Sequence, residues 1–174
     1  MIQAKRFAPN AVRRAAIARQ IACLHAASWR TAYRGLLADS YLDGEIEQER
    51  RRHWRERIDQ LADGTGEIFL ARIANVPAGF LCIDNDTEPE WGAFVDNLHV
   101  LPRWQGANLG GRLLDRGAAW ARDRGQRQLY LWVFERNYPA RRFYVRAGWR
   151  PAEKQIQEIP GGGRRSTLRL IKRI

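Results

Sequence analysis

The sequence is poor in cysteine, lysine and methionine, and it contains no long apolar run. Its 174 residues include two cysteines in apolar surroundings, Cys23 and Cys82, which lie far apart and without zinc-site spacing. A disulfide framework is therefore not indicated, no metal is expected, and a reducing cytoplasm is the expected compartment. The N-terminus lacks the apolar stretch of a signal peptide, and no segment approaches the roughly 20 apolar residues that cross a bilayer.

Acidic residues are scarce in the second part of the chain. Residues 101–174 contain 17 Lys and Arg against 5 Asp and Glu, whereas residues 1–100 contain 13 against 14. The net charge of +11 is thus carried by the C-terminal part, which suits a phosphate-bearing ligand. A solvated, arginine-rich surface is the other interpretation. No helix-turn-helix, zinc-finger or RNA-recognition pattern is present, so nucleic acid is not an expected partner.

The rest of the composition is that of a globular protein, with 45% hydrophobic and 10% aromatic residues. No repeat or linker divides the chain, which predicts one domain over residues 1–174. The hydrophobic periodicity predicts helices at Ala11–Ser28, Asp39–Leu61, Leu109–Arg124 and Asn137–Ala147, and strands at Ile2–Phe7, Glu67–Ala74, Ala78–Asp84, Ala93–Val100, Leu129–Phe134 and on both sides of Pro160–Gly163. Asp84–Trp91 is expected to be a polar loop. This order indicates a mixed α/β sheet with helices on both faces.

A glycine-rich turn joins the strand that ends at Val100 to the helix that begins at Leu109. It reads Gln105-Gly106-Ala107-Asn108-Leu109-Gly110-Gly111. A strand, a tight turn and a helix start direct backbone N–H groups and the positive end of the helix dipole at one point, which suits a phosphate. The turn lacks the Lys-Ser/Thr of a Walker loop and the spacing of a dinucleotide fingerprint.

A second block follows the buried strand that ends at Phe134. It reads Asn137-x-x-Ala140-x-x-Phe143-Tyr144-x-x-x-Gly148-Trp149. Asn137 is a good N-cap, and Gly148 is suited to end the helix. Apolar residues at helical spacing give this helix one buried face.

The two blocks resemble the signatures of the GNAT superfamily of N-acetyltransferases, Arg/Gln-x-x-Gly-x-Gly/Ala and Asn-x-x-Ala-x-x-Phe-Tyr-x-x-x-Gly-Phe/Trp. The second block matches at every position, and in the first Asn108 replaces a glycine. Asn is the non-glycine residue that best tolerates a left-handed backbone, so the turn is expected to form. The resemblance implies a bacterial-type, acetyl-CoA-dependent N-acetyltransferase. Its fold would be a mostly antiparallel sheet whose splayed central strands hold coenzyme A. It also implies acetyl transfer from acetyl-CoA to a primary amine of a small molecule or peptide by direct attack. Many members form homodimers, so a homodimer is an open expectation.

The resemblance assigns coenzyme A contacts to the end of the strand, the turn and the second block: Leu98, His99, Val100, Gln105, Gly106, Ala107, Asn108, Leu109, Gly110, Gly111, Asn137, Arg142 and Tyr144. Tyr144 matches the tyrosine that gives a proton to the leaving thiolate, although a core tyrosine is the alternative. Asn137 contacts coenzyme A, caps its helix, or does both.

The general base is not fixed by the resemblance, because the glutamate that some members have in the central strand is absent. Asp96 is the leading candidate, since apolar neighbours raise the pKa of a carboxyl group. Strict alternation places Asp96 on the face of Leu98 and Val100, with His99 opposite, unless a bulge intervenes. The alternatives are a water chain or one of three side chains, namely His99, Glu90 and Glu135.

The acceptor is also open. Trp29 and Tyr33 fall where the family walls its acceptor pocket, so they line that pocket with Asp96 or pack in the core. A run of acids would attract a cationic amine: Asp84, Asp86, Glu88, Glu90 and Asp96. Arg164 and Arg165, by contrast, would bind an acceptor carboxylate. A non-catalytic acyl-CoA-binding module and a basic nucleic-acid-binding domain are the alternative functions.

Overall fold

The protein is described by a computed structural model over residues 1–4, 11–61 and 64–174. One seven-stranded sheet has the order β1-β2-β3-β4-β5-β7-β6. The strands are β1 (Ile2–Ala4), β2 (Gly66–Ile73), β3 (Val76–Glu88), β4 (Gly92–Val100), β5 (Gln128–Phe134), β6 (Arg150–Ile159) and β7 (Gly163–Arg173), and the helices are α1 (Ala11–Ala32), α2 (Ile46–Leu61), α3 (Leu109–Arg122) and α4 (Tyr138–Arg146). The predicted fold class and element order are confirmed. No helix in the described part of the chain is long and apolar enough to span a membrane.

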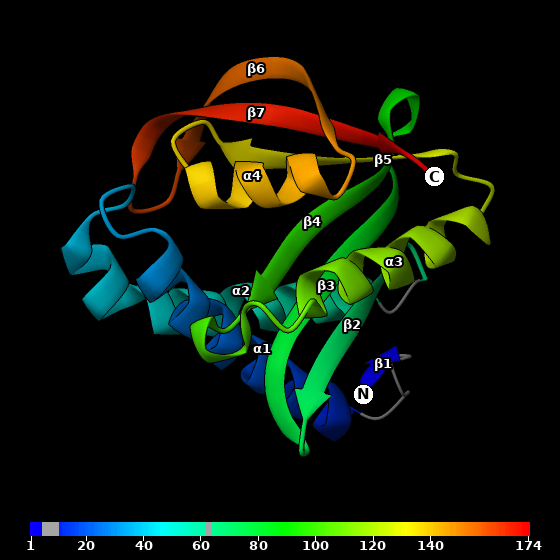
Figure 1. Cartoon of the computed structure of the whole chain (residues 1–174). Helices are drawn as coiled ribbons and strands as arrows, with labels where there is room; N and C mark the ends of the chain where they lie inside the picture. Colours follow the sequence, from blue (N-terminus) through cyan, green and yellow to red (C-terminus); the bar gives the residue numbers. More distant parts are fainter. Residues whose placement is uncertain (5–10, 62–63) are drawn as a thin grey trace.

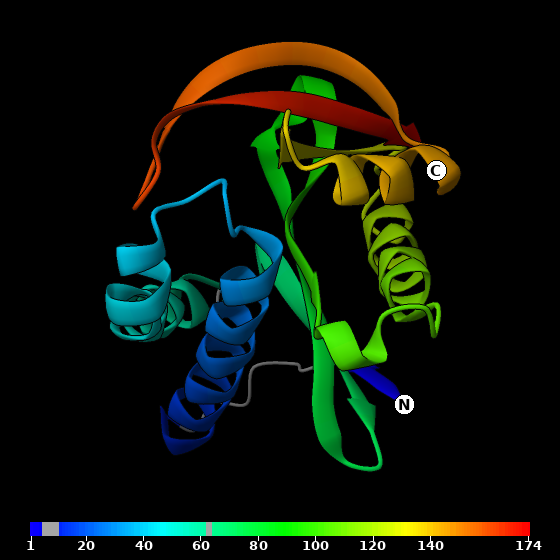
Figure 2. The same ribbon diagram turned by 60° about the vertical axis from the view of Figure 1, so that its left-hand side comes forward.

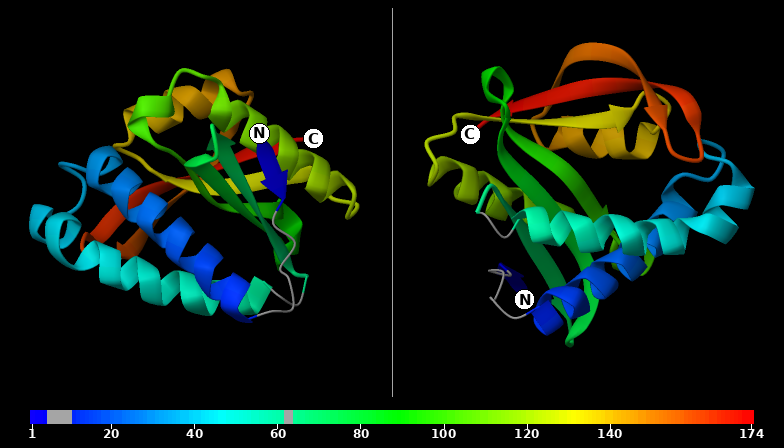
Figure 3. Two further views of the ribbon diagram at one scale, coloured as in Figure 1. Left: turned by 90° about the horizontal axis from the view of Figure 1, so that it is seen from below. Right: turned by 180° about the vertical axis from the view of Figure 1, so that it is seen from behind.

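Helices cover both faces of the sheet (Figures 2 and 3). The cause is the two-residue period of β3, whose side chains alternate between two cores. Phe80 and Cys82 pack with α1 and with Trp54 of α2. Leu81 and Ile83 face the other way, into the core that α3 and α4 close. All four side chains are fully buried, so β3 lies at the centre of the fold.

The parallel pair β4 and β5 separates along its length (Figure 1). Only Ala93 and Phe94 of β4 find partners on β5, namely Leu129 and Tyr130. The rings of Phe94 and Tyr130 stack at 4.8 Å and close the narrow end of the resulting opening. Beyond this point β4 keeps its partner β3 but leaves β5, so the predicted splay is present.

Several element boundaries differ from the prediction. The expected strand Ile2–Phe7 is described as β1, and its end lies outside the described residues. The expected helix Asp39–Leu61 begins with a π-helical turn, η1 (Tyr41–Glu45), before α2. The polar loop expected at Asp84–Trp91 is wrong, because β3 continues to Glu88 and a 3₁₀ turn, η2 (Pro89–Trp91), follows. Cys23 is exposed rather than packed among apolar groups, whereas Cys82 is buried.

The β6–β7 hairpin arches over the loop that joins α1 to η1 (Figure 2). The Ala38 N–H donates to the Gly161 carbonyl at 3.0 Å. Gly161 has φ +67°, and a Cβ there would overlap the Tyr41 ring, so only glycine fits this contact. This packing places the start of β7 beside the α1–η1 loop and the end of β5.

Candidate active site at the β4–β5 opening

The glycine-rich turn forms the wide mouth of the opening, at the N-terminus of α3. Asn108 adopts the left-handed conformation that the sequence required, with φ 53° and ψ 21°. Gly106 is also left-handed, with φ +84°. The Asn108 side chain makes no capping hydrogen bond, and the first intrahelical bond in this turn runs from the Arg112 N–H to the Asn108 carbonyl. The preceding backbone N–H groups therefore form a concentrated donor set with the helix dipole behind them.

The other residues of the turn differ in their contacts. The Gln105 side chain donates to the Val100 carbonyl at 3.1 Å, which ties the turn to the end of β4. Leu109 is buried, whereas Ala107 is exposed. A Cβ on Gly110 would lie 3.0 Å from Phe143 of α4, so glycine lets α3 and α4 approach each other. Gly111 is equally confined, because its Cβ would meet the Asn108 side chain.

The edge of β4 that faces the opening extends from Val95 to Val100. In the described part of the chain, these residues have no register partner on β5. Leu98 and Val100 pack toward the α3–α4 core. The backbone of Leu98, His99 and Val100 therefore lines the opening, as expected for contacts to a pantetheine arm.

The second block forms the opposite wall. The Asn137 Oδ1 accepts from the Ala140 N–H at 3.3 Å, so the predicted N-cap is present and the amide Nδ2 remains a donor. Tyr144 is buried, with its ring 5.7 Å from Trp149. Burial raises the pKa of the Tyr144 phenol well above its usual range, and the neighbouring Tyr33 phenol raises it further. Arg142 is exposed on the same helix.

Trp29 of α1 and Tyr33, which directly follows α1, cover the opening from the other side. The Trp29 Nε1 donates to His99 Nε2 of β4 at 3.4 Å. The Tyr33 ring lies 5.0 Å from Phe134 of β5 and 5.0 Å from Trp29. Burial raises the pKa of Tyr33 to about 12. The two aromatic side chains thus bridge the separated strands, with Trp29 on His99 of β4 and Tyr33 on Phe134 of β5.

All three histidines of the chain gather between α1, α2 and β4. The rings of His25 and His99 are buried, with centroids 4.4 Å apart. Burial, and then the nearby Arg50 cation, lower the pKa of His99 to about 3. Burial and the neighbouring His99 lower the pKa of His25 well below its usual value. Because His99 Nε2 accepts from Trp29, its Nδ1 carries the proton and donates to Ser28 Oγ at 3.0 Å.

The lowered pKa values of His25 and His99 predict that the folded protein loses stability in acid. Their folded pKa values lie below the unfolded value near 6.5, so their contribution to stability is complete above that pH and declines as the pH falls toward the folded value. Between pH 6 and 5 we expect His25 and His99 each to lower the free energy of unfolding by about 1 kcal/mol per pH unit. Urea unfolding of the wild type and His99→Gln at several pH values measures this. The variant should have the shallower slope, and identical slopes would contradict the assignment.

Asp96 does not lie where strict alternation put it. β4 has a bulge opposite Cys82 and Ile83 of β3, so Asp96 turns to the α2 face, away from the face of Leu98 and Val100. Its carboxylate lies 3.6 Å from the Arg57 Nε. Burial raises the pKa of Asp96, although Arg57 opposes that shift. Asp96 is therefore two residues beyond Phe94, the last β4 residue that pairs with β5, and it lies on the α1–α2 side of the sheet.

Arg57 was not predicted from the sequence as a site residue, but its guanidinium contacts Asp96 and two neighbouring side chains. Cys82, Asp84 and Asp96 offer ligand atoms within 4.8 Å of one another. The Arg57 guanidinium forms ion pairs with both carboxylates and lies 4.0 Å from the Cys82 Sγ. The protein thus supplies the cation for this cluster itself. Glu88, another acid of the predicted run, pairs with Arg169 at 2.8 Å, so Asp84, Glu88 and Asp96 of that run form ion pairs within the fold.

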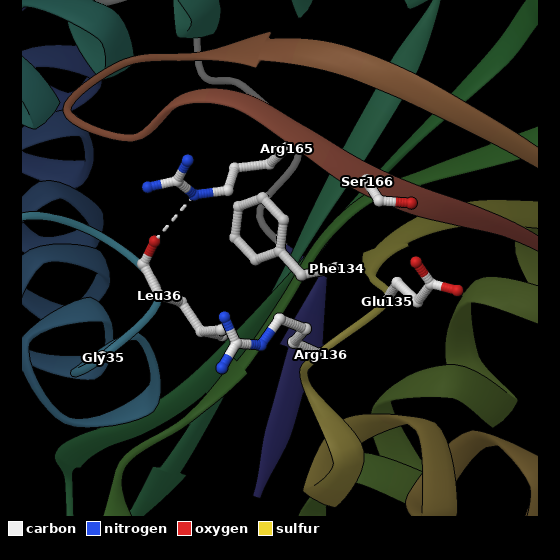
Figure 4. Close-up of a pocket in the computed structure, with 7 residues that line it drawn as sticks. All are labelled: Gly35, Leu36, Phe134, Glu135, Arg136, Arg165 and Ser166. Atoms are coloured by element: carbon white, nitrogen blue, oxygen red, sulfur yellow. Dashed lines mark hydrogen bonds between the residues drawn. The ribbon is translucent and has the colours of Figure 1, made fainter.

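A pocket of about 270 Å³ lies beside the aromatic wall, between the α1–η1 loop, the end of β5 and the start of β7 (Figure 4). It is lined by Gly35, Leu36, Phe134, Glu135, Arg136, Arg165 and Ser166. Of these, the sequence pointed to Arg165 as an acceptor contact and to Glu135 as an outside candidate for the base. Arg136 was missed, although its place between a strand end and an N-cap is a position where site residues are common.

The comparisons with known proteins agree with this geometry. Residues 28–149 match the model of the acetyltransferase (GNAT) family, and the chain belongs to that family. Aminoglycoside N(6′)-acetyltransferase type 1 of Stenotrophomonas maltophilia is 34% identical over 118 residues, which cover 64% of this chain and 71% of the relative. An uncharacterised N-acetyltransferase of Archaeoglobus fulgidus is 27% identical over 118 residues, covering 66% of this chain and 76% of that protein.

Solved structures support the same fold. The PaiA N-acetyltransferase of Thermoplasma acidophilum, in complex with coenzyme A, superposes with a TM-score of 0.74 at 14% identity, covering 100% of this chain and 99% of the other. A streptothricin acetyltransferase homologue of Bacillus anthracis, in complex with acetyl coenzyme A, gives a TM-score of 0.57 at 17% identity over 63% of each chain. By family, the chain is an acetyl-CoA-dependent N-acetyltransferase, with acetyl-CoA as its co-substrate.

The residues present fit this co-substrate. The turn from Gln105 to Gly111 offers uncapped N–H groups for a pyrophosphate. The confined glycines at 110 and 111 keep side chains away from that spot. The free β4 edge and Nδ2 of Asn137 offer hydrogen bonds to amide groups along the opening.

Proposed function

We propose that this chain transfers the acetyl group of acetyl-CoA to a primary amine of a small molecule or peptide, by direct attack through the β4–β5 opening. The observation that carries this proposal is the opening itself. It has a phosphate-type helix start at its mouth, a buried phenol on the α4 side and an aromatic wall on the α1 side. Acetyl-CoA supplies the activated acetyl thioester, and the chain supplies position, a proton donor and exclusion of water.

Tyr144 is proposed as the proton donor for the departing thiolate. Its raised pKa keeps the phenol protonated at neutral pH, which is the form that can donate. Backbone N–H groups of Leu98–Val100 are proposed to stabilise the oxygen that gains charge during attack, because β4 leaves that edge unpaired on the β5 side. Both groups belong to rigid elements, so they keep their positions without reorganisation.

Asp96 is proposed as the group that accepts the amine proton, directly or through water. A lysine-like amine with a pKa near 10.4 is mostly protonated at pH 7, so a base assists its attack. Asp96 lies on the α1–α2 side of the sheet, whereas Tyr144 packs on the α3–α4 side. The proposed base, Asp96, and the proposed acid, Tyr144, thus act on the amine and on the thiolate from opposite faces of the sheet.

Asp96→Asn tests this role. We expect kcat/KM for the amine to fall about 10- to 100-fold and the acidic limb of its pH profile to disappear. Asp84→Asn is the matched control, because Asp84 shares the partner Arg57 but lies on β3, one strand further from the opening. An unchanged pH profile in Asp96→Asn, or equal losses in both variants, would leave Asp96 with a structural role only.

Amine-dependent thiol release from acetyl-CoA tests the function as a whole. The acceptor panel contains aminoglycosides, because one relative is an aminoglycoside acetyltransferase, together with polyamines, amino acids and peptides. Turnover with any class supports the proposal. Binding of acetyl-CoA without turnover across the panel would favour the alternative, a non-catalytic acyl-CoA-binding module.

A further inference from the structure

We propose that the pocket beside the aromatic wall selects acceptors that carry an oxyanion, a carboxylate or a phosphate, near the reacting amine. This inference rests on the proposed acetyl transfer and names the acceptor class for it. Arg136 and Arg165 are the residues assigned to hold the anion. The pocket volume of about 270 Å³ suits a molecule of amino-acid size.

The two guanidiniums enter the pocket from different elements. Arg136 follows β5, whereas Arg165 belongs to β7, and both extend to the Leu36 side of Phe134 in Figure 4. The Arg165 Nε donates to the Leu36 carbonyl at 3.0 Å, and one terminal nitrogen donates to the Arg164 carbonyl at 3.1 Å. These bonds hold the Arg165 side chain over the pocket, and its other terminal nitrogen remains available as a donor.

The charge of the pocket is positive once internal pairs are counted. Glu135 is its acid, and this carboxylate pairs with Lys154 at 2.8 Å. Asp39 of the neighbouring loop and Asp43 of η1 both pair with Arg34. Among the residues that the structure describes, neither Arg136 nor Arg165 forms an ion pair with a carboxylate. Two guanidinium groups without acid partners on one pocket are a match for an oxyanion.

The pocket is connected to the opening by aromatic contacts. Phe134 lines the pocket with an apolar ring and contacts Tyr33, whose ring in turn contacts Trp29 at the opening. An acceptor with its anion on the two arginines and its apolar part on Phe134 therefore directs its amine toward the opening. A polycationic aminoglycoside would meet repulsion from the same arginines.

Paired acceptors test the proposal through thiol release. L-Phenylalanine is compared with L-phenylalaninamide, and phosphoethanolamine with ethanolamine, while kanamycin serves as the polycation. We expect kcat/KM to be about tenfold or more higher for the anionic member of at least one pair. The pair in which the anionic member has the higher kcat/KM identifies the anion that the pocket binds, a carboxylate or a phosphate. Equal rates within both pairs, or a preference for kanamycin, would overturn the proposal.

Single substitutions test whether the two arginines cause the preference for anionic acceptors. Arg136→Ala and Arg165→Ala should each raise KM for the anionic acceptor about tenfold, while changing KM for its neutral partner less than about twofold. Arg164→Ala is the matched control, because Arg164 precedes Arg165 on β7 but does not line the pocket. Losses that are equal for anionic and neutral acceptors, or equal in the control, would contradict the assignment.

A binding measurement separates this proposal from the proposed function. The same compounds are titrated into the protein saturated with coenzyme A, and the shift in its unfolding temperature is recorded. Stabilisation by the anionic members alone, lost in Arg136→Ala, supports the anion site even without turnover. Equal stabilisation by neutral partners, or none by any compound, would overturn it.

Discussion

Replacing Tyr144 with phenylalanine is expected to lower kcat about 100-fold, with little change in the KM for acetyl-CoA. The Tyr144 ring is buried against Trp149. Burial, and then the Tyr33 phenol, raise the pKa of the Tyr144 phenol, which therefore stays protonated at neutral pH. Phenylalanine keeps the ring packing and removes only the donor, so the chemical step is slowed while binding is retained. Steady-state kinetics with the best acceptor, together with calorimetry of coenzyme A binding, measure the two quantities separately.

Tyr33→Phe is the matched control for this change. Tyr33 is the second phenol at the opening, and its ring contacts Phe134 and Trp29. Because Tyr33 belongs to the wall, its loss of a hydroxyl should lower kcat less than about fivefold. A large loss of kcat in Tyr33→Phe with a small loss in Tyr144→Phe would identify Tyr33 as the proton donor and overturn the role given to Tyr144.

Introducing a negative charge into the glycine-rich turn is expected to weaken the binding of coenzyme A and acetyl-CoA. Ala107 is exposed in the turn that precedes α3, where the helix dipole and uncapped N–H groups favour an anion. Ala107→Asp places a carboxylate beside the expected pyrophosphate, and we expect about a 10- to 100-fold higher Kd from repulsion at this partly screened site. Calorimetric titration with coenzyme A measures the Kd.

Ala107→Asn is the isosteric, uncharged control. It should bind coenzyme A within about threefold of the wild type, because the backbone N–H groups are unchanged. Gly110 is less suitable for this test, since any side chain there also pushes against Phe143. Equal Kd values for the aspartate and asparagine variants would mean that the turn does not face the phosphates.

Local chemistry explains which parts of the fold could be predicted. Asn108 was expected to tolerate a left-handed backbone, and Asn137 to cap its helix, because each role depends on the residue and its immediate neighbours. The order of helices and strands followed from hydrophobic periodicity for the same reason. The splay of β4 from β5 came with the family resemblance and is present in the pairing of the strands.

Tertiary contacts explain what the sequence could not provide. The bulge that turns Asp96 toward Arg57 breaks the alternation on which its face was assigned. β3 extends to Glu88, where that carboxylate pairs with Arg169 of the distant strand β7. The pocket that joins Arg136 to Arg165 exists only because the β6–β7 hairpin packs on the α1–η1 loop.

Direct transfer is the central claim, and two-substrate initial-rate kinetics test it most directly. Of the two cysteines, Cys82 is buried beside Arg57 and Cys23 is exposed on α1, so neither is placed as a nucleophile in the opening. Rates measured while acetyl-CoA and the amine are both varied should give intersecting reciprocal plots, which indicate a ternary complex. Parallel plots, accompanied by an acetylated protein after exposure to acetyl-CoA alone, would contradict the account.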